Sequence, residues 1–155
     1  AEKLAQIYPD VKTLRDVSLE QLYAAKAALR DREYRRALHV VGECTRVHLA
    51  VERLEKGDVE GFGQLWFDSH ESSRVNFENS TPEFYYLVEL AKSVPGCLGA
   101  RLSGGGFGGI TVHLVESSAA EEYARRVAAA YKVRTGITAE YIICAIGNGA
   151  ELYNF

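Results

Sequence analysis

The sequence of 155 residues contains no methionine, only three prolines and three cysteines, and no excess of positive charge. The missing initiator leaves two explanations open: removal of the first residue before Ala1, or a piece cut from a longer protein. A formal net charge of −3 gives no electrostatic reason to expect a nucleic-acid partner. No apolar run approaches the roughly 20 residues of a membrane span, and the N-terminus has no signal-peptide pattern. We therefore expect a cytoplasmic protein with neither a nucleic-acid nor a membrane partner.

The few cysteines exclude a disulfide framework and a zinc site. Cys44, Cys97 and Cys144 are odd in number and have no metal-ligand spacing, which favours buried thiols in a reducing compartment. We assign no metal ligand. A hydrophobic content of 47% and a charged content of 25% are ordinary for a globular domain, and the length suffices for one domain with a core.

The first half of the sequence has the periodicity of helices. Ser18 begins a capping-box pattern, and apolar residues then recur at helical spacing over 33–56. Gly57 and Asp58 are expected to end this long helix and to cap the next one. A further helix starts at Thr81 with Pro82. The predicted inner face of the long helix consists of Ala37, Val40, Val41, Cys44, Val47, Val51 and Leu54. That of the later helix consists of Phe84, Leu87, Val88 and Ala91.

The second half changes to the alternation of β-strands. Residues 98–103 and 110–115 alternate as strands do, and "AEYIICAIG" at 139–147 predicts a third strand. Ser118 with Glu121 is expected to cap the helix between the last two strands, which ends near Gly136. Helices followed by β-loop-β-α-β predict an α+β sandwich with helices on one face of an antiparallel sheet. A ferredoxin-like split unit would need one more strand, from outside this sequence.

The loop "SGGGFGG" at 103–109 is longer and richer in glycine than a hairpin needs. It contains G-x-G-x-x-G but enters a strand instead of a helix, so it is not a dinucleotide fingerprint. It is not a Walker A loop, and no H-R-D or D-F-G motif supports a protein-kinase loop. Successive glycines can turn several N–H groups toward one point and form a nest for phosphate oxygens. The alternative is a structural loop packed against a neighbouring domain.

Individual loop positions have separate expectations. Gly105, Gly106 and Gly108 are predicted to adopt positive φ or to lie close to phosphate, where a Cβ atom would clash. The Phe107 ring is predicted to anchor the loop against the helices or a partner domain. Arg101, two residues before the loop, either supports a phosphate site or forms an ordinary ion pair.

Other polar residues carry weaker signals. The run "SHESSR" at 69–74 faces either a partner domain or cleft, or solvent. Cys97 is close to the loop in sequence but has no neighbouring base, so we expect it to be inert. The histidines lack the spacing of a zinc protease and are predicted to be structural or exposed: His39, His48, His70 and His113.

Taken together, these segments resemble the GHMP kinases, the family of galactokinase, homoserine kinase, mevalonate kinase and phosphomevalonate kinase. "GARLSGGGFGGITVHLV" at 99–115 resembles the third conserved motif of that family, in a form most similar to its galactokinase branch. "YRRALHVVGECTRV", "GDVEGFGQLWFDSHESSRVNFENSTPEF" and the closing "GNGA" resemble further segments of this branch. The match covers nearly the whole chain.

The resemblance implies a GHMP kinase C-terminal domain over residues 1–155, with a ferredoxin-like sandwich fold, as part of a longer two-domain enzyme. That enzyme would transfer the γ-phosphate of ATP, with Mg²⁺, to a small sugar, which in this branch of the family is galactose. The catalytic aspartate and most sugar-binding residues belong to an N-terminal domain, so no catalytic residue is assigned here and the chain alone is expected to be inactive. The implied nucleotide-binding residues are Ser103, Gly104, Gly105, Gly106, Phe107, Gly108 and Gly109.

Departures from the galactokinase pattern leave the sugar open. Tyr85 stands where the pattern has Asp, and Val75 and Asn76 replace acidic or polar positions. The alternative function is a stand-alone small-ligand-binding or regulatory module with the same fold. A domain taken from a larger protein would also expose its interface around the loop and residues 69–74, which would favour self-association.

Overall fold

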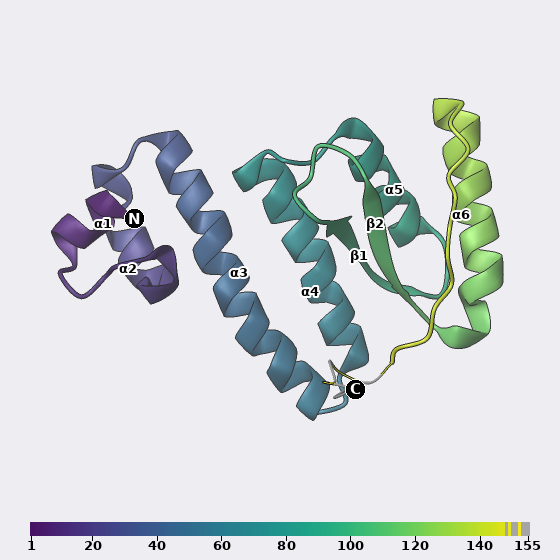
Figure 1. Ribbon diagram of the computed structural model, residues 1–155, viewed down its shortest axis with the longest axis horizontal. Helices are drawn as coiled ribbons and strands as arrows, with labels where there is room; N and C mark the ends of the chain where they lie inside the picture. The colour runs from purple at the N-terminus through teal and green to yellow at the C-terminus, as the bar shows by residue number, and fades with distance from the viewer. Residues whose placement is uncertain (148, 150–151, 153–155) are drawn as a thin grey trace.

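The computed structural model describes residues 1–147, 149 and 152 (Figure 1). The closing "GNGA" motif lies partly outside these residues, at positions 148 and 150. Short 3₁₀ turns and one π-helical turn, Ser73–Phe77, connect the main elements. In chain order these elements are α1 (Glu2–Ile7), α2 (Leu19–Ala24), α3 (Asp31–Glu55), α4 (Val59–Ser72), α5 (Pro82–Ser93), β1 (Cys97–Ser103), β2 (Ile110–Val115) and α6 (Ala120–Thr135).

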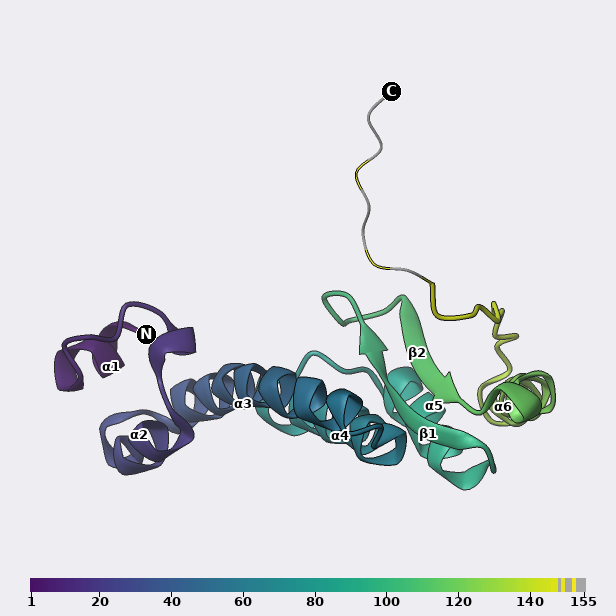
Figure 2. The ribbon, with the colours of Figure 1, turned by 90° about the horizontal axis from the view of Figure 1, so that it is seen from below.

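Two apolar cores are joined by the long helix α3 and by α4 (Figures 1 and 2). The first core packs α1 and α2 against the first half of α3. The second core packs α5 and α6 against one face of the sheet, where Ala100 and His113 pair across the strands. This confirms the predicted α+β class with helices on one face. The buried members are Leu4, Val11, Val17, Leu22, Ala25, Ala37 and Val41 in the first core, and Val88, Ala91, Ala100, Tyr123 and Val127 in the second.

Most predicted helix ends are confirmed by local hydrogen bonds. Ser18 Oγ accepts from the Gln21 amide, and Asp58 caps α4 through the Gly61 amide. Gly57 adopts a left-handed conformation after α3, with a φ of 69°. The predicted Ser118 cap is wrong. The chain makes a 3₁₀ turn over 117–119 first, and α6 then begins without a side-chain cap.

The predicted inner face of α3 is half correct. Ala37 and Val41 are buried, whereas Val47, Val51 and Leu54 are exposed, with 62% of Val47 accessible. Figure 1 shows the reason: α1 and α2 cover only the first half of α3, and the second half has α4 alone beside it. The second half of this face of α3 is therefore an exposed apolar surface in the described structure.

The sheet contains two antiparallel strands in the described residues, with Arg101 opposite Val112. Helix α4 packs directly on β1: a Cβ atom at Gly63 would lie 2.2 Å from the Leu98 carbonyl oxygen. The predicted third strand at 139–147 is wrong, because the segment is extended but has no strand beside it with which to form a ladder. None of the described helices is long and apolar enough to cross a membrane.

Candidate functional site

The glycine-rich loop has an unusual backbone conformation. Ser103 ends β1 and Ile110 begins β2, so the structure confirms a strand-loop-strand arrangement. Gly105 is the exception to the expected pattern, because it does not adopt positive φ. Positive φ angles occur at Gly104 (81°), Gly106 (84°), Phe107 (61°), Gly108 (138°) and Gly109 (113°).

Much of this backbone faces open space. A Cβ atom added at Gly104, Gly105, Gly108 or Gly109 would meet nothing within 4 Å. Gly106 is different, since its Cβ would lie 2.2 Å from the backbone oxygen of Asn79. Packing within the chain therefore requires glycine at position 106, whereas the other four positions leave the backbone accessible to a ligand.

Asn79 anchors the loop. Its backbone oxygen accepts a hydrogen bond from the Phe107 amide at 2.9 Å, and its Nδ2 donates to the Gly105 carbonyl at 3.1 Å. Asn79 is buried, and its Oδ1 has no hydrogen-bond partner among the described residues. Sequence reasoning missed this residue. The only signal was its place in the "FENS" segment, which gave no role to its side chain.

The predicted Phe107 anchor against the helices is wrong. The ring is 76% exposed, and Phe107 is held through its backbone amide instead. A non-glycine residue at positive φ costs about 1–2 kcal/mol, so the Asn79 contacts must offset strain at this position. Contact between this ring and a partner domain stays a prediction.

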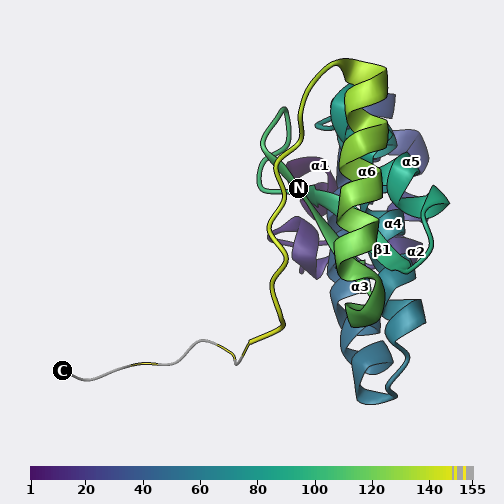
Figure 3. The same cartoon turned by 90° about the vertical axis from the view of Figure 1, so that its right-hand side faces the viewer.

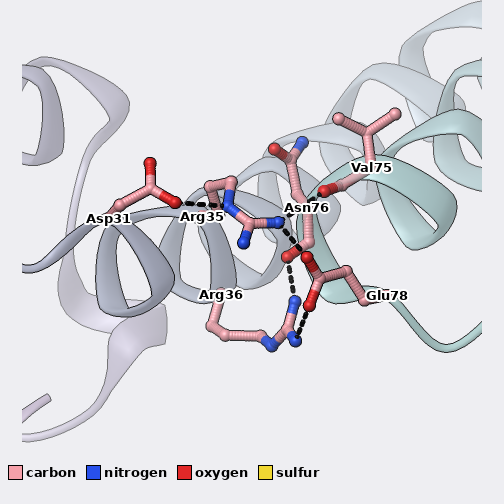
Figure 4. Close-up of polar contacts among 6 residues, drawn as sticks. All are labelled: Asp31, Arg35, Arg36, Val75, Asn76 and Glu78. Carbon is pink, nitrogen blue, oxygen red and sulfur yellow. Dashed lines mark hydrogen bonds and ion pairs between the residues drawn. The ribbon is translucent and has the colours of Figure 1, made fainter.

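An ion-pair cluster fixes the segment that leads into Asn79 (Figure 4). Both Arg35 and Arg36, on α3, pair with the Glu78 carboxylate, and the Arg36 Nη2 distance is 2.5 Å. The same arginines donate to backbone oxygens: Arg35 to Val75 at 3.0 Å and Arg36 to Asn76. Hydrogen bonds from the two guanidinium groups lower the pKa of Glu78 to about 2. Glu78 has a φ of 59°, so this cluster also stabilises a strained turn.

The polar run at 69–74 faces neither a partner nor solvent along most of its length. Ser69, His70, Ser72 and Ser73 are buried inside the domain, and only Glu71 and Arg74 are exposed. The expectation of an exposed interface is therefore wrong for this run. The run lies between α3, α4 and β1, and hydrogen bonds satisfy its buried polar groups. Ser69 Oγ donates to the Glu43 carboxylate at 2.8 Å, and Ser72 Oγ lies 3.1 Å from His39 Nδ1. The Leu102 amide donates to His70 at 3.2 Å.

Three of the histidines have structural partners and His48 is exposed, as predicted. Because His70 Nδ1 accepts from a backbone amide, its proton is on Nε2, and burial lowers its pKa to about 4. His113 contacts the Tyr123 hydroxyl and lies 2.8 Å from the Thr111 hydroxyl, and burial lowers its pKa to about 4 as well. Both rings are neutral at pH 7.

Arg101 and Cys97 behave as ordinary structural residues in the described chain. The Arg101 guanidinium lies 3.7 Å from the Glu43 carboxylate. Of the two alternatives for Arg101, a phosphate site or an ordinary ion pair, the described chain shows the ion pair. Burial raises the pKa of the Cys97 thiol, so this cysteine stays protonated and unreactive near pH 7.

Comparison with known proteins agrees with this fold and loop. The model of the family described as GHMP kinases C terminal matches residues 50–133. The chain belongs to the GHMP kinases and corresponds to their C-terminal part, which confirms the predicted family and fold class.

Its relatives include galactokinases from distant organisms. The chain is 43% identical to galactokinase of Roseiflexus sp. (strain RS-1) over 94% of its own length and 37% of that protein. It is also 43% identical to human galactokinase, over 91% of the chain and 35% of the relative. The crystal structure of Lactococcus lactis galactokinase complexed with galactose matches 95% of the chain and 38% of that protein, with a TM-score of 0.87 at 30% identity. The chain thus spans little more than a third of these relatives.

Proposed function

We propose that this chain is the C-terminal domain of a galactokinase. The intact enzyme transfers the γ-phosphate of ATP to the anomeric hydroxyl of galactose and forms galactose 1-phosphate. The similarity to galactokinases over more than nine-tenths of the chain supports this assignment. The partner is the N-terminal GHMP kinase domain, which carries the catalytic groups and most sugar contacts. We place the enzyme in the cytoplasm, and the three free cysteines of the chain support that compartment.

The observation that carries the proposal is an open backbone held in a strained form. Residues Ser103–Gly109 combine consecutive positive φ angles with empty space above four of their five glycines. Within this stretch Gly104 and Gly106 have positive φ and Gly105 between them does not, and such an alternation can direct successive N–H groups toward one point and create a site for anions. We infer that this loop closes on the ATP phosphates, with Ser103 before its first three glycines and Phe107 between those and the last two.

The chemistry of the loop suits phosphoryl transfer. Such a reaction depends on positioning and on stabilising charge at the phosphate oxygens, and neither requires an acid or a base from this chain. Asn79 holds the loop through the Phe107 amide and the Gly105 carbonyl, so the other backbone N–H groups of the loop can donate to these oxygens without reorganising during the reaction. Mg²⁺, which neutralises phosphate charge, would arrive with ATP. The described residues contain no group of three metal-ligating side chains that would hold it independently.

A pair of glycine substitutions tests the proposal in the full-length polypeptide, meaning the product of the complete coding sequence. Gly106→Ala introduces a left-handed alanine in the loop, and Gly57→Ala introduces one of similar φ at the far end of α3. We expect Gly106→Ala to lower galactose-dependent ATP turnover at least tenfold and Gly57→Ala to leave it close to wild type. Equal turnover in both variants, at matched folded fractions, would contradict the role of the loop.

The chain alone provides a second test. Because it lacks the proposed catalytic domain, we expect no galactose-dependent ATP hydrolysis from the purified 155 residues. Its exposed apolar side chains on α3, including Val47 and Val51, also favour self-association, which light scattering would detect. Robust turnover by the chain alone would overturn this division of roles.

A further inference from the structure

Phe107 carries the only side chain among residues 104–109, because the other five residues are glycines. It belongs to neither apolar core, and its ring is 76% exposed. The other phenylalanines that the structure describes are at most 37% exposed. In Figures 2 and 3 the connection between β1 and β2 projects from the sheet on the side away from α4 and α5. Within the described residues, the ring therefore lies mostly in open space.

Two features of Phe107 are unfavourable at the same time. Its φ of 61° is a conformation that glycine adopts without strain and that L-residues rarely adopt. Its ring also lacks the stabilisation that burial of a large apolar side chain provides. The Asn79 backbone oxygen accepts a hydrogen bond from the Phe107 amide at 2.9 Å, which holds the strained backbone in place. Strained residues that their surroundings hold in this way are typical of functional sites.

The ring adjoins the backbone that we propose as a phosphate site. A Cβ atom would meet nothing within 4 Å at Gly104, Gly105, Gly108 or Gly109. Directly after these glycines, Ile110 is a second apolar side chain with high exposure, 63%. The loop thus combines accessible backbone N–H groups with apolar surface. Apolar surface adds nothing to anion binding in open water, but it strengthens charge interactions where it excludes water, because the local dielectric constant falls.

We propose that the Phe107 ring excludes water from the γ-phosphate of ATP when the loop closes, and so directs the phosphoryl group to the sugar. This inference rests on the proposed function. In the transfer, the sugar hydroxyl oxygen forms a bond to the γ-phosphorus, and the bond from that phosphorus to the β–γ bridging oxygen breaks. The hydroxyl proton passes to a base in the N-terminal domain.

Water can replace the sugar hydroxyl in the same displacement. Its oxygen then forms the new bond to phosphorus, and the products are ADP, inorganic phosphate and a proton. A ring that occupies the place of this water suppresses hydrolysis without taking part in either reaction. Phe107 is therefore a residue that controls the partition between transfer and hydrolysis, and the catalytic groups stay in the other domain.

The partition ratio of the full-length polypeptide tests this role. The ratio is the inorganic phosphate released per galactose 1-phosphate formed, measured at saturating ATP, Mg²⁺ and galactose. Phe107→Ala should raise this ratio by roughly tenfold, and Phe107→Leu, which keeps much of the apolar volume, should raise it less. Val133→Ala removes apolar surface from a side chain on α6 that is 89% exposed, and it is the matched control with an unchanged ratio.

The melting temperature of the chain alone excludes a general loss of structure. Because the ring has little packing in the described residues, Phe107→Ala should leave that temperature close to the wild-type value. Lower turnover of Phe107→Ala at an unchanged ratio would overturn the proposal, since the ring would then only place the loop or contact the partner domain. Unchanged turnover at an unchanged ratio would overturn it as well. A wild-type full-length polypeptide that forms no galactose 1-phosphate would overturn the proposed function, and this inference with it.

Discussion

Replacing Gly106 by alanine in the chain alone tests how the loop is held. At a φ of 84°, alanine costs about 1–2 kcal/mol more than glycine. The new Cβ would also lie 2.2 Å from the Asn79 backbone oxygen, so the loop must move away. That movement breaks the Phe107 amide bond to Asn79 and the Asn79 Nδ2 bond to Gly105, each worth about 0.5–1.5 kcal/mol. Together these terms amount to about 2–5 kcal/mol in the free energy of unfolding, and we expect the lower half of that range because a detached loop also releases the strain at residue 106.

Alanine substitutions at two neighbouring glycines separate the cost of backbone strain from the cost of the steric contact with Asn79. Gly104→Ala introduces a left-handed alanine in open space and should cost about 1–2 kcal/mol. Gly105→Ala adds neither strain nor contact and should be close to neutral. Urea unfolding gives the free energies, and hydrogen exchange at the Phe107 amide reports detachment of the loop. Equal destabilisation by Gly106→Ala and Gly104→Ala, with the Phe107 amide still protected, would refute the anchoring by Asn79.

Three further outcomes follow from the structure. The free energy of unfolding should fall as the pH drops from about 6.5 to 4, because His70 and His113 accept protons more readily when unfolded. Each histidine contributes a slope of up to about 1.4 kcal/mol per pH unit in this range. In urea titrations at several pH values, His70→Gln should remove the contribution of one histidine from this slope. Gly63→Ala should lower the free energy of unfolding by about 3 kcal/mol in thermal melts, because its methyl group meets a β1 carbonyl. Glu78→Gln removes the carboxylate that pairs with two arginines, so exchange at the Phe107 amide should accelerate in NMR spectra; unchanged exchange would exclude Glu78 from positioning the loop.

Local signals in the sequence predicted much of the fold. The caps at Ser18, Asp58 and Thr81 depend on hydrogen bonds within three residues, so a short window of sequence contains both partners. The strand pair and its glycine loop are likewise adjacent in the chain. These features depend on nearby residues and are confirmed.

The incorrect predictions concern long-range contacts. Residues 139–147 have the alternation of a strand, but a ladder needs a neighbour that the described chain does not supply. The run at 69–74 appeared to be a surface because its residues are polar, whereas partners on α3 and β1 satisfy its buried groups. The loop anchor is Asn79 instead of the Phe107 ring, because an amide separated by 26 residues reaches the loop backbone.

Hydrogen exchange of the loop in the presence of nucleotide tests the central claim most directly. The measurement compares the amides of residues 104–109 in the full-length polypeptide, without nucleotide and with a saturating non-hydrolysable ATP analogue and Mg²⁺. If the loop closes on the phosphates, these amides should exchange at least tenfold more slowly with the analogue, and Gly106→Ala should reduce that protection. Unchanged exchange at residues 104–109 when the analogue is bound elsewhere in the enzyme would contradict the proposed phosphate site.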